Sequence, residues 1–212
     1  MASVSDLAAR LRLTLVVSQA EAAPRTVMGL AEKAFGGGAT ALQLREKSLC
    51  GREFFALAQA LATFCRERGK LFIVNDRLDI AMASGADGVH LGQTDLPAGP
   101  ARELLGPGRL LGISAATGAE GREALDAGAD YLGVGAIVRT DSKTEADELD
   151  PAQVPRLIAL GLPTVAIGGI SAHNAGGVWA MGFTGLAVIS ALTRSADPAA
   201  TARDLLRGAP KG

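Results

Sequence analysis

One phrase occurs four times along this chain, and each copy joins the end of a predicted helix to a predicted buried strand. The copies are GGATALQL at 37–44, SGADGVHL at 84–91, AGADYLGV at 127–134 and MGFTGLAV at 181–188. In every copy a glycine ends the helix, and a short apolar run follows. Because these four junctions are evenly distributed, they favour a single (β/α)8 TIM barrel over an open doubly wound sheet.

Strand-like and helix-like segments alternate along the whole chain, and no change in composition marks a linker, so we expect one catalytic domain over 1–212. The predicted strands cover 13–17, 41–45, 71–74, 89–91, 110–114, 131–134, 164–167 and 186–189. The predicted helices cover 24–35, 52–68, 100–105, 119–127, 152–160, 172–181 and 198–206, with a short helix after the third strand and a helix or loose terminus over 1–12. Such barrels usually take about 250 residues, so the loops must be short. The polar connection 138–150 is the exception, and we expect it to be functional.

Charge and composition exclude several classes of function. The chain has 21 Lys and Arg against 22 Asp and Glu, without blocks of like charge, which argues against a nucleic-acid or anionic-membrane partner. We find no signal-peptide pattern and no apolar run of about 18 residues, so we expect a cytoplasmic protein. Cys50 and Cys65 form no CxxC, and Cys65 lies on the apolar stripe of helix 52–68, where we expect it to be buried. No GxGxxG follows the first strand, which weakens a dinucleotide-binding interpretation.

The residues that follow the strands carry the chemistry of this chain. In a barrel the C-terminal ends of all strands meet at one mouth, so we expect the active site there. The residues expected at the mouth are Gln43, Arg45, Lys47, Asn75, Asp76, Asp95, Ser114, Thr140, Ser142, Lys143, Gly168, Gly169, Ile189 and Ser190. Any one of them alone would be interpreted as a solvated loop residue or a helix cap. As a group they match a site for anionic ligands.

Two carboxylates and three cations in this group predict a magnesium–diphosphate site. Asp76 and Asp95 each follow a strand by one or two residues, and their hard oxygens, without His or Cys nearby, favour Mg²⁺ completed by water and substrate phosphates. Arg45, Lys47 and Lys143 add positive charge from three strand ends. Three cations with a divalent metal suggest two linked phosphates.

A second anion site is predicted at the seventh and eighth strands. Gly168-Gly169 and the segment 185–190 match the place where barrels bind phosphate through backbone N–H groups. Two anionic substrates are the simplest explanation of two such sites.

No strong general base stands out in the sequence. His90 lies inside a strand, where a wall or core residue is favoured over a base, and His173 begins a surface helix. Glu46 is the best spare carboxylate, but its neighbours suggest an ion pair with Lys47 or Arg45. We therefore expect displacement of a leaving group rather than proton abstraction or acyl transfer.

Taken together, these residues closely resemble the thiamine-phosphate synthase family. The matching segments are QLREK at 43–47, VNDR at 74–77, GVHLGQTD at 88–95, GIS at 112–114, GADYLGVG at 128–135, the loop 140–143, AIGGI at 166–170 and AVIS at 187–190. They occur in the family's order. QLREK, NDR and HLGQTD are highly specific, whereas related phosphate-binding barrels share GADYLGVG and IGGI.

The resemblance implies a transferase that joins hydroxymethylpyrimidine diphosphate to hydroxyethylthiazole phosphate and releases pyrophosphate. It implies one Mg²⁺ per subunit, held by Asp76 and Asp95. The residues implied for the pyrimidine diphosphate are Gln43, Leu44, Arg45, Glu46, Lys47, Asn75, Ser114 and Lys143, of which Arg45, Lys47, Ser114 and Lys143 are implied to be catalytic. Those implied for the thiazole phosphate are Thr140, Asp141, Ser142, Gly169, Ile189 and Ser190.

The chain departs from the family after its sixth predicted strand. The family loop usually reads like GPIFPTxTK, whereas residues 135–143 read GAIVRTDSK, so two prolines and a phenylalanine are lost and Ser142 replaces a threonine. Two alternatives stay open: a thiazole tautomerase that needs no diphosphate, and a non-catalytic sensor of phosphate esters on the same barrel. The sequence also leaves open whether the chain forms a homo-oligomer.

Overall fold

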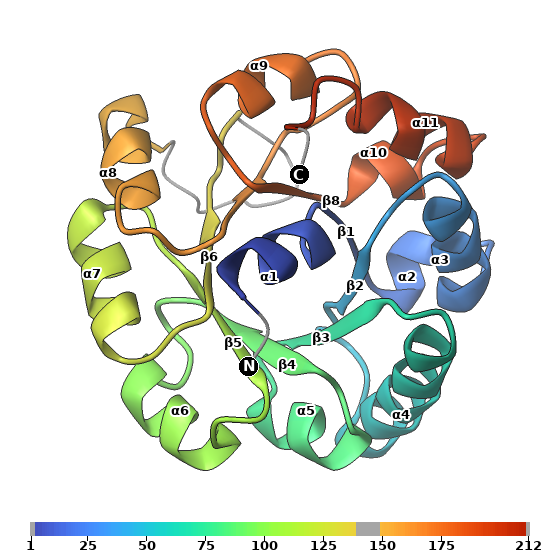
Figure 1. The fold of residues 1–212 in the computed structure, drawn as a ribbon. Helices are drawn as coiled ribbons and strands as arrows, with labels where there is room; N and C mark the ends of the chain where they lie inside the picture. Colours follow the sequence, from blue (N-terminus) through green and yellow to red (C-terminus); the bar gives the residue numbers. More distant parts are fainter. Residues whose placement is uncertain (1–2, 139–148, 211–212) are drawn as a thin grey trace.

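Eight parallel strands close into a barrel in sequence order, as the computed structural model of residues 3–138 and 149–210 shows (Figure 1). The strands are β1 (Leu13–Val17), β2 (Ala41–Leu44), β3 (Leu71–Asn75), β4 (Gly88–Leu91), β5 (Leu110–Ser114), β6 (Tyr131–Val134), β7 (Thr164–Ile167) and β8 (Gly185–Val188). The barrel closes where β1 pairs with β8 through Leu13–Leu186 and Thr14–Ala187. The predicted (β/α)8 fold is confirmed.

Helices surround the barrel and follow the predicted order (Figure 1). They are α1 (Val4–Arg10), α2 (Gln19–Ala22), α3 (Val27–Gly36), α4 (Gly51–Glu67), α5 (Leu78–Ser84), α6 (Ala98–Leu105), α7 (Gly118–Asp126), η1 (Pro151–Gln153), α8 (Val154–Ile158), α9 (Ala175–Ala180), α10 (Ser190–Thr193) and α11 (Pro198–Leu205). The short helices α2 and α10 were not predicted. The predicted helix 24–35 begins later, at Val27, because Thr26 caps its first turn by accepting the N–H of Gly29.

The repeated phrase has a repeated structure. Its helix-ending glycines all have positive φ, namely 107° at Gly38, 76° at Gly85, 85° at Gly128 and 95° at Gly182. Two residues later a threonine or aspartate accepts the N–H of the first or second residue of the preceding strand, in the pairs Thr40–Leu13, Asp87–Phe72, Asp130–Leu111 and Thr184–Thr164. Each copy therefore ends one helix and also fixes the start of the neighbouring strand.

Helix α1 covers the N-terminal end of the barrel and lies over its centre in Figure 1. Leu7 and Leu11 pack against the inward-facing side chains Val16, Leu71 and Tyr131. These apolar contacts cover the N-terminal end of the barrel, so the C-terminal ends of the strands form its open mouth.

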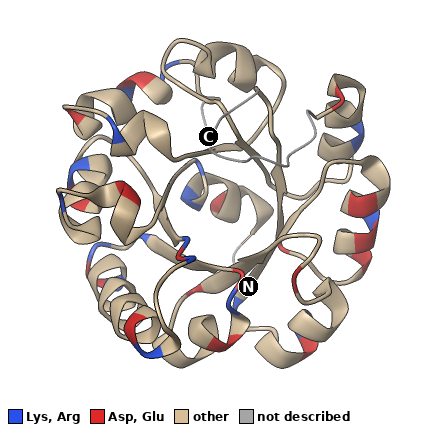
Figure 2. Ribbon diagram, turned by 180° about the vertical axis from the view of Figure 1, so that it is seen from behind, with Lys and Arg blue, Asp and Glu red and all other residues tan. Residues whose placement is uncertain are grey.

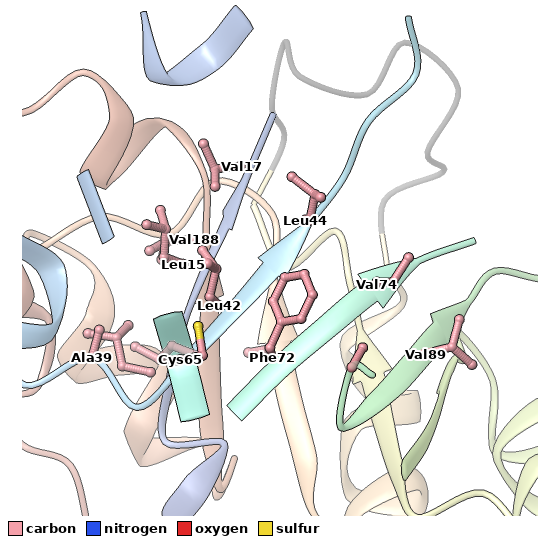
Figure 3. Packing of buried hydrophobic residues seen from close by; sticks show 14 of the residues in the cluster. Leu15, Val17, Ala39, Leu42, Leu44, Cys65, Phe72, Val74, Val89 and Val188 are labelled. Atoms are coloured by element: carbon pink, nitrogen blue, oxygen red, sulfur yellow. The ribbon is translucent and has the colours of Figure 1, made fainter. Parts of the chain in front are cut away.

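The outward-facing side chains of the strands form the main hydrophobic core with the helices (Figure 3). Leu44, Phe72 and Val74 are fully buried there, and α4 contributes Cys65. The prediction that Cys65 is buried is confirmed. Aliphatic side chains dominate this layer because the strands alternate between the core and the barrel interior.

Charged residues of both signs are mixed over the outer helices (Figure 2). Within residues 3–138 and 149–210, no helix has both the length and the apolar character needed to cross a membrane.

Candidate active site

A cavity of about 210 Å³ runs from the barrel interior to the mouth formed by the C-terminal strand ends. Its floor includes Leu11 and Thr14, next to the helix that closes the other end. Eight of the predicted site residues line it: Gln43, Arg45, Lys47, Asn75, Asp76, Asp95, Ser114 and Ile189. The structure therefore brings together side chains from β2, β3, β4, β5 and β8 as the strand-end argument required.

Asp76 takes an unusual backbone conformation at the end of β3. Its φ is +64°, and it is the one non-glycine residue with positive φ in the described part of the chain. Its N–H donates to the carbonyl of His90 at 2.8 Å, which holds it against β4. Its carboxylate lies 2.5 Å from Nζ of Lys47. The strand pairing thus supports a strained residue, as is common at functional sites.

Asp95 reaches the same place by a different route. The strand ends at Leu91, as predicted, so Asp95 lies four residues beyond it, in the turn that follows, and the expected spacing of one or two residues is wrong. The N–H of Gly92 donates to Oδ2 of Asp95 at 2.7 Å, and the N–H of Asp95 donates to the carbonyl of Gly92 at 3.2 Å. This closed turn brings the carboxylate back to the mouth, next to Asp76.

The electrostatics of the carboxylate pair show a site short of positive charge. The pKa of Asp95 is raised, first because burial disfavours its charged form and then because Asp76 lies beside it. The hydrogen bond from Gly92 and the charge of Lys47 oppose this shift but do not cancel it. A divalent cation between the two carboxylates would remove the repulsion.

The donor set fits Mg²⁺ better than a metal held by protein ligands alone. Among residues 3–138 and 149–210 no group of three or more His, Cys, Asp or Glu side chains could enclose a metal. Two carboxylates with open space beside them match a Mg²⁺ ion that keeps water and substrate phosphates as ligands. Neither aspartate caps the helix that follows, because the N-cap positions of α5 and α6 are Arg77 and Pro97.

The cations beside the carboxylates face the cavity. Arg45 lines it, and within the described residues its guanidinium forms no ion pair. The predicted ion pair of Glu46 with Lys47 or Arg45 is wrong: Lys47 pairs with Asp76, and the Glu46 carboxylate accepts the N–H of Gln19 at the start of α2. Glu46 is buried there, so it holds α2 in place and is not the ion-pair partner of either cation.

Two residues implied for the pyrimidine diphosphate do not present their side chains to the cavity. Leu44 points into the outer core (Figure 3), and Glu46 is bound to α2. A contact of either residue with a ligand would have to come from its main chain, and the prediction of such contacts stays a prediction.

The ends of β7 and β8 lie where the second anion site was predicted. Gly168 and Gly169 have φ of 102° and 65°, and a methyl group at Gly169 would come within 2.6 Å of the carbonyl oxygen of Val138. Ile189 lines the cavity, and Ser190 begins the short helix α10. Thr140, Asp141, Ser142 and Lys143 lie outside the described residues, so their predicted roles stay predictions.

The cavity also contains polar residues that the sequence argument did not assign to a ligand. His90 lies in the wall, as expected, and its ring contacts Ser114 and Tyr131. Tyr131 and Thr14 were not singled out at all. The signal that could have found them is the strand alternation, which places both at inward-facing positions of β6 and β1.

A closed parallel barrel with carboxylates, cations and glycine-rich strand ends at its mouth is the architecture of enzymes that act on phosphorylated small molecules. The chain belongs to the thiamine monophosphate synthase family, whose model (TMP-TENI) matches residues 13–192. Its activity is thiamine-phosphate synthesis, a transferase reaction between small-molecule substrates.

Individual relatives support this assignment over nearly the whole chain. The thiamine-phosphate synthase of Moorella thermoacetica is 50% identical over 195 residues, which cover 91% of this chain and 93% of the relative. The thiamine-phosphate synthase of Chlorobium luteolum is 47% identical over 84% of this chain and 85% of the relative. The solved structure of a thiamine phosphate pyrophosphorylase from Pyrococcus furiosus is 35% identical, with a TM-score of 0.85, and the match covers 95% of this chain and 96% of that one. A 3-hexulose-6-phosphate synthase, 18% identical with a TM-score of 0.67, shares the fold.

Proposed function

We propose that this cavity joins hydroxymethylpyrimidine diphosphate to hydroxyethylthiazole phosphate by a dissociative displacement that Mg²⁺ assists. The observation that carries the proposal is the gathering of Asp76, Asp95, Lys47 and Arg45 around one cavity. Two carboxylates with two cations suit a metal-bound diphosphate better than a neutral ligand or a single phosphate.

The first step breaks the C–O bond between the pyrimidine methylene group and the diphosphate. The bonding electron pair leaves with pyrophosphate, so the cations must stabilise negative charge that grows on the leaving oxygen. Lys47 and Arg45 are positioned for this role, since both line the cavity beside the carboxylates. Lys143 is proposed to join them. Mg²⁺ bound at Asp76 and Asp95 would neutralise further charge on the diphosphate.

The second step captures the methylene cation that remains on the electron-rich pyrimidine ring. The lone pair of the thiazole nitrogen forms the new C–N bond, and no proton has to be removed from a carbon or a water molecule. This agrees with a cavity whose carboxylates are paired or hydrogen-bonded rather than placed as a free base. Proximity of the two bound substrates supplies much of the remaining acceleration.

The remaining residues are proposed to position the two substrates. Gln43 and Asn75 are buried in the cavity wall, where their amides can hold the pyrimidine diphosphate. Gly169, Ile189 and Ser190, at the ends of β7 and β8, are proposed to hold the thiazole phosphate together with residues 140–142.

The direct test is to mix both substrates with Mg²⁺ and to measure thiamine phosphate by mass and pyrophosphate by release. We expect Asp76→Ala to lower turnover by about 10²–10³, the usual cost of losing one electrostatic stabiliser. Asp79→Ala is the matched control, because Asp79 is an exposed carboxylate that pairs with Arg77 outside the cavity. Its turnover should be unchanged.

Three outcomes would contradict the proposal. Near-normal turnover of Asp76→Ala would remove the metal site from the mechanism. Metal-independent isomerisation of a thiazole carboxylate phosphate without condensation would indicate a tautomerase. Binding of both substrates without product would indicate a sensor.

A further inference from the structure

Three polar side chains from neighbouring strands form a hydrogen-bonded chain inside the barrel. Nδ1 of His90, on β4, lies 3.1 Å from the hydroxyl oxygen of Tyr131, on β6. Nε2 of the same ring lies 3.0 Å from Oγ of Ser114, at the end of β5. These hydrogen bonds thus lead from the barrel interior, where Tyr131 is only 2% exposed, to a serine that lines the cavity.

Two glycines make room for the rings of Tyr131 and His90. A methyl group at Gly112 would lie 2.1 Å from Cζ of the Tyr131 ring, and one at Gly133 would lie 2.6 Å from Cε1 of His90. Both distances are far below van der Waals contact, so any larger residue at either position would displace a ring. These glycines belong to the GIS and GADYLGVG segments. Their sequence positions are therefore explained by the two rings and not by a turn.

The number of available hydrogens decides which group donates in the hydrogen bond between Tyr131 and His90. Tyr131 is buried, and burial raises the pKa of its hydroxyl, so it keeps its proton. In the described part of the chain the hydroxyl of Tyr131 has one hydrogen-bond partner, Nδ1 of His90. If Nδ1 carried a hydrogen, the buried tyrosine hydrogen would have no acceptor, which is costly. Tyr131 therefore donates to Nδ1, and the ring hydrogen lies on Nε2.

We propose that Tyr131 and His90 are positioning residues that make the Ser114 hydroxyl a donor toward the substrate. With its hydrogen on Nε2, His90 donates to Oγ of Ser114, and the serine hydrogen must point away from the ring. The main chain of Ser114 is fixed as well, because its carbonyl accepts a hydrogen bond of 2.5 Å from the Gln93 amide. The serine O–H is thus aimed at the cavity before a ligand arrives, as preorganised donors are.

The opposite tautomer would give the serine the opposite role. Ser114 would then donate to Nε2 and offer the ligand only an acceptor, which repels a diphosphate oxygen. Part of this inference rests on the proposed function, since it takes the diphosphate as the ligand of Ser114. The tautomer itself does not depend on any substrate.

The first experiment determines the tautomer of His90 in the substrate-free protein. The chain contains two histidines, so two-bond ¹H–¹⁵N correlation spectra of ¹⁵N-histidine-labelled protein give two ring patterns. His173→Gln removes the pattern of the exposed second histidine and serves as the assignment control. We expect Nε2 of His90 to be protonated and Nδ1 not. A protonated Nδ1 in the wild-type protein would overturn the proposal.

Tyr131→Phe tests whether the tyrosine hydroxyl sets this tautomer. The variant keeps the ring in its place beside Gly112 and removes only the hydroxyl. We expect the two nitrogen shifts of His90 to move toward each other, because both tautomers become populated. An unchanged pattern would exclude Tyr131 as the cause.

The kinetic test is a double-mutant cycle between Tyr131→Phe and Ser114→Ala. The net worth of one hydrogen bond predicts a loss of kcat of about 2- to 12-fold for Tyr131→Phe, with a smaller change in KM for the diphosphate. In the Ser114→Ala background the same change should have no further effect, since its action passes through the serine. Independent, multiplying losses would refute the positioning role. Absence of condensation by a wild-type protein with the expected tautomer would refute the proposed function and leave the hydrogen-bonded chain intact.

Discussion

Replacing Lys47 by methionine should tighten the binding of a divalent cation and slow turnover at the same time. The ammonium group of Lys47 lies 2.5 Å from Oδ2 of Asp76 and offsets part of the negative charge of the carboxylate pair. A metal ion at Asp76 and Asp95 must displace this ammonium group. The lysine therefore competes with the metal before substrate binds, although both cations act on the diphosphate afterwards.

The size of the expected change in metal affinity follows from the solvent exposure of the Lys47–Asp76 ion pair. The side chain of Lys47 is 59% exposed and that of Asp76 is 22% exposed, which places the pair among exposed ion pairs worth about 0.2–1 kcal/mol. At about 1.36 kcal/mol per factor of ten, its removal should tighten metal binding by about 1.4- to 5-fold. Turnover should fall by about 10²–10³, because the leaving pyrophosphate loses one stabilising cation.

The assay is a titration of the substrate-free protein with Mn²⁺, followed by electron paramagnetic resonance, with Mg²⁺ added as competitor. Mn²⁺ suits the same oxygen ligands and reports directly on bound metal. Lys33→Met is the matched control, since it makes the same change at an exposed lysine on α3. Metal affinity that is unchanged or weaker in Lys47→Met, with an unchanged control, would show that Lys47 does not compete for the carboxylates.

Three further predictions concern stability and reactivity. The raised pKa of Asp95 means that the folded protein holds this proton more tightly than the unfolded chain, so stability is lost as pH rises through the folded pKa. In metal-free buffer Asp95→Asn should therefore raise Tm near neutral pH but not in acid. An equal gain in Tm at both pH values would contradict this cause. Burial raises the pKa of the Cys65 thiol to about 12, so a thiol reagent should modify exposed Cys50 alone in the native protein and both cysteines after denaturation. Ser84→Ala should raise the free energy of unfolding by about 0.5–1 kcal/mol in chemical denaturation, because the buried Ser84 hydroxyl has no hydrogen-bond partner within the described residues and alanine favours the helix. A loss of stability would show that the hydroxyl has an unrecognised partner.

The sequence was sufficient for the barrel and for most residues of the mouth. Short, mostly apolar segments between helical patterns located all eight strands, because strands of a buried parallel sheet are rich in apolar residues. The ends of those strands then placed residues such as Arg45, Asp76 and Ser114 around one cavity. Topology alone made this inference valid, since parallel strands of a barrel all end at the same rim.

Features that depend on tertiary contacts could not be found in this way. The helices α2 and α10 have four residues each, too few for a periodic pattern. The partner of Glu46 is a main-chain N–H at Gln19, a group that every residue has and that no pattern marks. The left-handed backbone of Asp76 and the turn that returns Asp95 to the mouth depend on hydrogen bonds whose geometry a sequence does not display.

The repeated phrase separates the residues that build the barrel from those that give it chemistry. Its glycine, its threonine or aspartate and its outward-facing apolar positions are nearly the same in all four copies, because each copy must end a helix, hold the preceding strand and fill the outer core. Its two inward-facing positions hold a different pair of residues in each copy, namely Ala41 and Gln43, Gly88 and His90, Tyr131 and Gly133, Gly185 and Ala187. A symmetric scaffold would place four equal side chains in each inner layer, and equal side chains could neither bind two different substrates nor orient a single serine. In a barrel built from such repeats, the positions at which the copies disagree on the inward face are therefore the first place to look for the site, and here they supply Gln43, His90 and Tyr131.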